Sequence, residues 1–135
     1  MSTNFEERRQ HIRVYFESLE EIGCEFSYGA GTPRVSSAAV LDMSLGGLHL
    51  VVDKPCDFAA GERITLNRLS HRDDLISEET ITAEIRWVYT SEEFSRVYLG
   101  CKFLDLPPKS QTGIANLISD KLLQASSARM GKTHR

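Results

Sequence analysis

Arginines cluster near the start of the chain, where Arg8, Arg9 and Arg13 stand within six residues. Their spacing is R-x-x-x-R with one further arginine in front. A guanidinium is planar, permanently charged and forked, so it binds phosphate oxygens or the acceptor edge of guanine and can stack on a base. An isolated pair at this spacing is more often a solvated surface, with Glu6 as a weak partner of Arg9. The cluster therefore indicates an anion site only where a second group of residues supports it.

A second group of polar residues follows at positions 42–47, in a D-x-S-x-x-G pattern. Asp42 supplies a carboxylate that can accept hydrogen bonds from guanine N1 and N2, and Ser44 can donate to a phosphate or a base. Gly47 permits a tight turn, or the approach of a ligand to a backbone that has no Cβ. The same residues also make an ordinary turn, in which Asp and Ser bond their own backbone and glycine supplies a positive φ.

The two motifs, in this order and within a chain of mainly β pattern, resemble the signature of PilZ domains, which bind cyclic di-GMP. The segment 100–106 is similar to the last barrel strand of that family, and the resemblance spans roughly residues 6–120. It implies that an arginine arm folds over the barrel when the ligand binds. The ligand-binding residues that it implies are Arg8, Arg9, Arg13, Asp42, Ser44 and Gly47.

This resemblance implies a ligand-gated receptor or adaptor that is not an enzyme, has no cofactor beyond its ligand and acts on an unnamed downstream protein in motility, biofilm formation or a related bacterial process. In the family, an arginine directly before R-x-x-x-R tends to accompany an intercalated ligand dimer, so Arg8 predicts two ligand molecules per chain. Two alternatives stay open. One is an interaction module that does not depend on ligand, and the other, less favoured, is an enzyme acting on cyclic dinucleotides. The sequence has no H-E-x-x-H, no G-x-S-x-G and no zinc-ligand spacing.

Alternating apolar and polar residues predict six strands that would position these motifs, at about 22–28, 35–41, 48–52, 63–67, 81–89 and 97–103. Each strand has one apolar and one polar face, which favours an antiparallel sheet, and closure into a barrel would remove its edges. The alternation places Trp87 and Tyr89 on the apolar face, so we expect Trp87 in the core, with stacking on a ligand as the alternative. His49 and Arg86 are expected at the surface or half-buried, and His11 is a candidate to line the site.

After two prolines, apolar residues repeat at helical spacing over 110–126, with Ser110 as a candidate N-cap. The fold expected is mainly β, a six-stranded antiparallel PilZ-type barrel with a C-terminal helix. The helix could cap its own barrel or pair with a second chain, and we favour the cap. The chain divides into a flexible arm at 1–13, the barrel with its helix at 14–126, and a disordered tail at 127–135. The predicted docking stripe of the helix consists of Ile114, Leu117, Ile118, Leu122 and Ala125.

Charge and cysteine content restrict the partners and the compartment. The net charge of the 135 residues is −3, and because the first 13 carry +1 and the last seven +3, the body between them carries −7. An acidic body argues against DNA or RNA binding. Three cysteines at wide spacing predict reduced thiols and no metal site, and no stretch has the length of a membrane span. A cytoplasmic protein without membrane insertion is expected.

Overall fold

The structure, a computed structural model, describes residues 11–53, 57–77 and 79–133. The described chain contains eight strands, one short 3-10 helix and one long α-helix. Their bounds are β1 Val14–Tyr15, η1 Ser18–Glu20, β2 Ile22–Tyr28, β3 Arg34–Met43, β4 Gly47–Val52, β5 Arg63–His71, β6 Asp74–Ser77, β7 Ile81–Ser91, β8 Arg96–Asp105 and α2 Pro108–Thr133.

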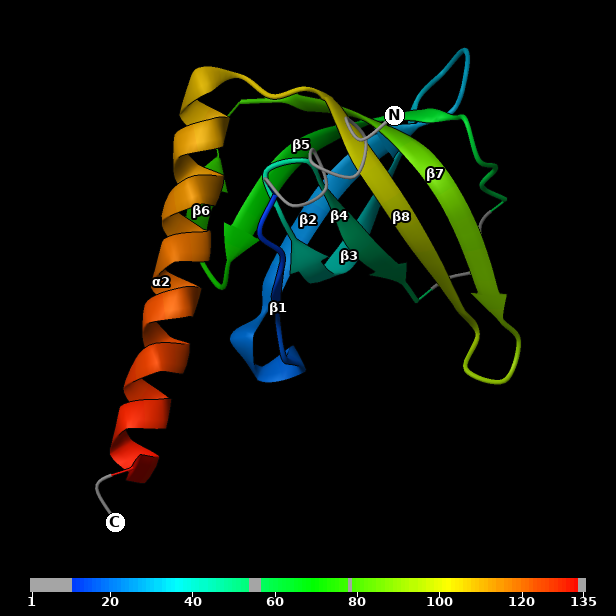
Figure 1. Ribbon diagram of the computed structural model, residues 1–135. Helices are drawn as coiled ribbons and strands as arrows, with labels where there is room; N and C mark the ends of the chain where they lie inside the picture. The colour runs from blue at the N-terminus through cyan, green and yellow to red at the C-terminus, as the bar shows by residue number, and fades with distance from the viewer. Residues whose placement is uncertain (1–10, 54–56, 78, 134–135) are drawn as a thin grey trace, which may run out of the picture.

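Six strands close into an antiparallel barrel, which confirms the prediction from the alternating patterns (Figure 1). Hydrogen-bonded neighbours follow the order β3, β2, β5, β7, β8, β4, and β4 pairs again with β3 to complete the ring. Two short strands lie outside this ring, with β1 paired to β3 and β6 paired to β5. The sequence did not predict β1 and β6, because a run of two or four residues is too short to display an alternation.

Apolar side chains that point inward fill the barrel and form one core. The two cysteines that the structure describes, Cys24 and Cys101, lie in this core as free thiols. Burial raises the pKa of both thiols, to about 12 at Cys101, so neither is a nucleophile near neutral pH. The largest fully buried side chains of the barrel are Phe26, Met43, Leu48, Leu50, Ile64, Leu66, Leu69, Ile81, Ile85 and Leu99.

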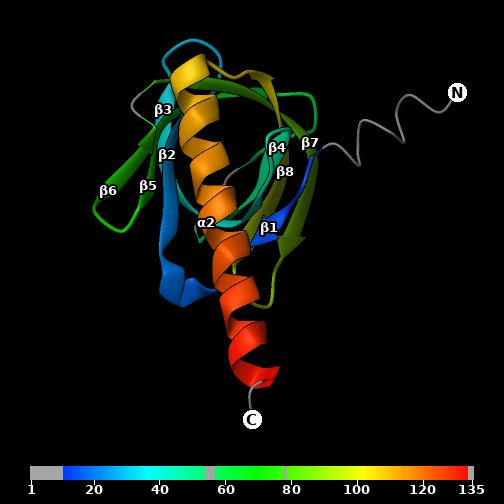
Figure 2. The same ribbon diagram turned by 60° about the vertical axis from the view of Figure 1, so that its left-hand side comes forward.

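The first half of α2 packs beside the barrel (Figure 2). Ile114 and Ile118 are buried there, 0% and 7% exposed. The hydroxyl groups of Ser110 and Ser77 form a buried hydrogen bond of 2.6 Å between α2 and β6. The helix begins at Pro108, so the prediction that Ser110 caps it is wrong. Proline suits the first helical position because the amide that it lacks has no partner there.

The second half of α2 projects past the barrel and ends at Thr133 (Figure 1). Leu122 is 41% exposed and Leu123 66% exposed, whereas the predicted stripe placed Leu122 on the docking face. Helical periodicity identifies the residues that share a face, but it does not tell how far the surface beneath them extends. Residues 127–133, assigned from the sequence to a tail, continue the helix. In the described ranges, no helix combines the length and apolarity that crossing a membrane requires.

Candidate functional site

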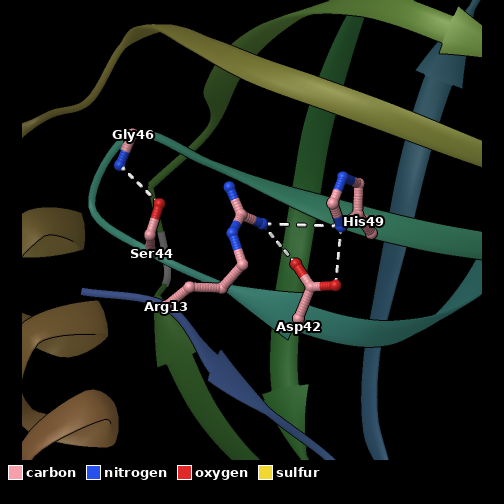
Figure 3. A network of polar contacts seen from close by, with 5 residues as sticks. All are labelled: Arg13, Asp42, Ser44, Gly46 and His49. Atoms are coloured by element: carbon pink, nitrogen blue, oxygen red, sulfur yellow. Dashed lines mark hydrogen bonds and ion pairs between the residues drawn. The ribbon is translucent and has the colours of Figure 1, made fainter. Parts of the chain in front are cut away.

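Strand β1 places Arg13 against the end of β3. Val14 pairs with Met43 and Tyr15 pairs with Asp42, so Arg13, the residue before β1, lies beside the second motif. The Nη1 atom of Arg13 forms an ion pair with Oδ1 of Asp42 (Figure 3). The two motifs, whose contacting residues are 29 positions apart in the sequence, therefore meet at one place.

A β-bulge turns Asp42 away from the barrel interior. Val40 and Asp42 lie opposite consecutive residues of β4, so Leu41 is an extra residue in β3. In a regular strand Asp42 would share the inward face of Val40, because side chains alternate between faces. Instead its Oδ2 lies 2.6 Å from Nδ1 of His49, directly across on β4 (Figure 3). Asp42 is only 5% exposed, and Arg13 and His49 together engage both of its oxygens.

Ser44 and the two glycines shape the turn between β3 and β4. Gly46 N donates to Ser44 Oγ at 3.1 Å (Figure 3). Ser44 N donates to Gly47 O at 2.9 Å, so Ser44, which is 1% exposed, stabilises the turn. Gly47 does not have a positive φ. A Cβ added there would lie 2.1 Å from the carbonyl oxygen of Cys101. Close approach by the backbone of β8 is therefore the structural reason for this glycine.

Trp87 lies at the surface, 44% exposed, and its predicted place in the core is wrong. Ile85 pairs with Cys101 and Trp87 pairs with Gly100, so Arg86 is an extra residue in β7 and forms a second bulge. The bulge reverses the alternation, and Trp87 and Tyr89 both point outward. A Cβ added at Gly100 would lie 2.1 Å from Nε1 of Trp87, which means that the indole lies across the bare backbone of Gly100.

His49 and Trp87 meet over this same glycine. Gly100 pairs with His49 on one side, in β4, and with Trp87 on the other, in β7. Their ring centroids are 5.0 Å apart with an interplanar angle of 45°. Contacts therefore run without interruption from Arg13 through Asp42 and His49 to Trp87.

The outer face of these strands carries a pocket of about 680 Å³, which is within the range typical of small-molecule sites. Three permanent or near-permanent cations line it, Arg13, Arg86 and Lys102, and none of its described lining residues is a carboxylate. A site with this charge attracts an anion even though the whole chain is acidic. The pocket is lined by His11, Arg13, Ser44, Gly46, Gly47, His49, Arg86, Trp87, Cys101 and Lys102.

The structure brings together four of the six residues that the sequence predicted for the site: Arg13, Asp42, Ser44 and Gly47. Arg8 and Arg9 lie outside the described residues. Three of the four line the pocket, and Asp42 contacts two of the lining residues, Arg13 and His49.

Other lining residues belong to neither motif. His11, a candidate from the sequence, packs against Gly46, where an added Cβ would lie 3.2 Å from its ring. Four pocket residues were not predicted as such from the sequence: His49, Arg86, Trp87 and Lys102. The alternation in the predicted strands 48–52 and 97–103 puts His49 and Lys102 on the polar faces, and this was the available signal. The bulge that exposes Trp87 had no such signal.

A family model described as the PilZ domain matches residues 7–120. This chain belongs to the PilZ domain family. The match covers both motifs, the six barrel strands and the docked half of α2, so it confirms the resemblance found from the sequence. No curated protein matches this PilZ domain in sequence.

Solved structures share the fold at low identity. The PilZ domain of YcgR from Escherichia coli with c-di-GMP has a TM-score of 0.63 and 15% identity, over 90% of this chain and 97% of that one. The K. pneumonia MrkH–c-di-GMP complex has a TM-score of 0.67 and 17% identity, over 90% and 55%. The Bacillus subtilis inhibitor of motility MotI/DgrA has a TM-score of 0.59 and 15% identity, over 87% and 52%. The present PilZ domain spans about half the length of the MrkH and MotI chains.

Proposed function

We propose that this PilZ domain binds cyclic di-GMP in the cationic pocket and acts as a ligand-gated receptor or adaptor. The observation that carries the proposal is the meeting of Arg13 with Asp42 at the edge of a pocket lined by three cations. The ligand carries two phosphodiester anions and two guanines, which suit a positive site that also contains aromatic rings. The YcgR and MrkH structures contain c-di-GMP, which supports the same choice here.

Arg13 is the residue best placed to hydrogen-bond to a guanine. Its Nη1 is committed to Asp42, while its Nε and Nη2 form no hydrogen bond to a described residue. The free edge of the guanidinium can donate to guanine O6 and N7 together. Asp42, with both oxygens engaged, acts by orienting Arg13 and His49 rather than by contacting the base.

Arg8 and Arg9 complete the site from the segment 1–13. We assign them to ligand phosphates or bases once this arm closes over the pocket, and Arg8 to a second, stacked ligand molecule. Closure of the arm changes a surface that a downstream protein can read, in motility, biofilm formation or a related process. The function requires no cofactor and no catalysis, and we place it in the cytoplasm. The test of stoichiometry is calorimetry, with two ligands bound by the wild type and one by Arg8→Ala.

Isothermal titration calorimetry with cyclic di-GMP tests the central proposal, with cyclic di-AMP and GTP as ligand controls. Arg13→Ala removes the charged donors and should weaken binding about tenfold or more. Arg68→Ala is the matched control, because Arg68 is exposed on β5 and does not line the pocket. The absence of heat from the wild type at micromolar ligand, or equal affinity of the two variants, contradicts the proposal.

A ligand-independent interaction module is the second candidate. Tyr89 and Phe94, 61% and 63% exposed, lie with Trp87 along the β7–β8 hairpin and give a protein partner an aromatic surface. Unchanged partner binding in both Arg9→Ala and Asp42→Ala, together with its loss in Tyr89→Ser, would favour this candidate over the receptor.

A further inference from the structure

We propose that Lys102 contacts a phosphate of the ligand and that Arg86 supports it, so that β7 and β8 form a second cationic wall facing Arg13. Neither residue belongs to the two sequence motifs, and both line the pocket. The inference rests on the binding of cyclic di-GMP proposed above and assigns the far side of that site.

The strand register places Lys102 directly beside the second motif. Lys102 lies opposite Gly47 across the β4–β8 pair. The two backbones are so close that a Cβ at Gly47 would lie 3.1 Å from Cα of Lys102. The neighbours of Lys102 in β8, Cys101 and Phe103, are buried in the barrel. Alternation therefore directs Lys102 outward, beside the pocket.

The ion pairs around Lys102 leave its ammonium group available. Glu84 is the cross-strand neighbour of Lys102 on β7, but the carboxylate of Glu84 pairs with Arg86 at 3.4 Å. Lys102 itself forms no ion pair with any residue in the described ranges. Of the three cations that line the pocket, Arg13 pairs with Asp42 and Arg86 pairs with Glu84. The positive charge of Lys102 has no such partner among the described residues, and an anionic ligand would supply one.

The geometry of the ligand offers anions on two sides. A cyclic dinucleotide carries its two phosphodiesters on opposite edges of one ring, so Arg13, held beside Asp42, reaches one of them more easily than the other. Lys102 lies on β8 and Arg86 on β7, whereas Arg13 directly precedes β1, which pairs with β3 on the other side of β4. A lysine ammonium is a point charge, which suits a phosphate oxygen better than the paired acceptors of a base.

Titration of three lysine variants with cyclic di-GMP tests the inference. Lys102→Gln should weaken binding about fivefold, the size expected for one exposed ion pair. Lys102→Arg keeps the charge and should bind within about twofold of the wild type. Lys109→Gln is the matched control, since Lys109 is exposed at the start of α2 and does not line the pocket. The affinity of Lys102→Gln should also depend less on salt than that of the wild type, because one charge contact is lost.

The outcomes separate this inference from the function on which it rests. A wild type that gives no signal with cyclic di-GMP overturns the proposed function itself. A wild type that binds, with Lys102→Gln and Lys109→Gln equal in affinity and in salt dependence, overturns only the role of Lys102. Thermal unfolding of all variants, expected to be unchanged because both lysines are exposed, shows whether an affinity loss arises from misfolding.

Discussion

Two glycines determine how the side chains of the pocket are arranged, although neither has an unusual backbone conformation. Gly47 lets the backbone of β8 approach the motif, and Gly100 provides the bare backbone over which the rings of His49 and Trp87 meet. In both cases the missing Cβ serves contact within the protein itself. A glycine in a binding motif can therefore be required by packing beside the ligand as well as by the ligand.

Gly100→Ala should displace Trp87 with little loss of stability. The new methyl group would lie 2.1 Å from the indole, and the ring, already 44% exposed, can rotate into solvent. We expect a red-shifted fluorescence spectrum that reports this site alone, because Trp87 is the single tryptophan of the chain. The free energy of unfolding should fall by about 1 kcal/mol or less. Gly23→Ala is the control, since its Cβ would be 3.6 Å from the nearest atom, and an identical shift in both variants would contradict the account.

Asp42 should contribute to binding chiefly through Arg13. Their ion pair predicts that Asp42→Asn and Arg13→Ala lose affinity non-additively, because the second change removes a side chain that the first has already released. Calorimetry of both single variants and the double variant measures the coupling, expected at about 0.5–3 kcal/mol. Losses in affinity that simply add would mean that Asp42 contacts the ligand independently of Arg13.

At the scale of elements, the two bulges account for most of the difference between the predicted and the observed site. Alternation along β3 and β7 identified both strands, and it holds until Leu41 and Arg86 each add one residue. Beyond those points, residues that regular alternation would point inward point outward instead. This change brings Asp42 and Trp87 out of the barrel and toward the same pocket. A bulge depends on the register of the neighbouring strand, so a period-2 pattern within one strand cannot predict it.

The stability of Gly113→Ala should show how tightly α2 packs against β6. Replacing glycine by alanine inside a helix normally stabilises a protein by about 1 kcal/mol. At Gly113 the sign should reverse, because the new Cβ would lie 2.1 Å from the carbonyl oxygen of Ile76. Ser119→Ala, at an exposed position of the same helix, is the control and should be neutral or slightly stabilising. Chemical denaturation of the two variants measures the difference, and a stabilised Gly113→Ala would show that this contact is loose.

At the scale of the whole molecule, the sequence was sufficient for the barrel and, through the family resemblance, for the proximity of Arg13 and Asp42, but only in part for the pocket. Six strands and a C-terminal helix follow from local periodicity, which reports burial residue by residue. The contact between Arg13 and Asp42 followed from the family resemblance, since residues 29 positions apart leave no local trace of their proximity. His49 and Lys102 join the site through pairings between β3 and β4 and between β4 and β8, and these pairings exist only after the barrel closes.

The distribution of charge over the whole chain predicts selectivity for a small anion over a nucleic acid. The net charge is −3, and the cations described at the site lie around one pocket instead of forming a stripe that could follow a phosphate backbone. Duplex DNA should therefore give no change in fluorescence anisotropy at physiological salt up to about 100 µM protein, the weak end of non-specific binding. Cyclic di-GMP should bind under the same conditions. DNA binding that Lys102→Gln weakens would mean that the pocket accepts a polyanion. If truncation after Ser126 abolishes DNA binding, the basic residues of 127–135 are responsible for it. The charge of that segment is opposite in sign to that of the body.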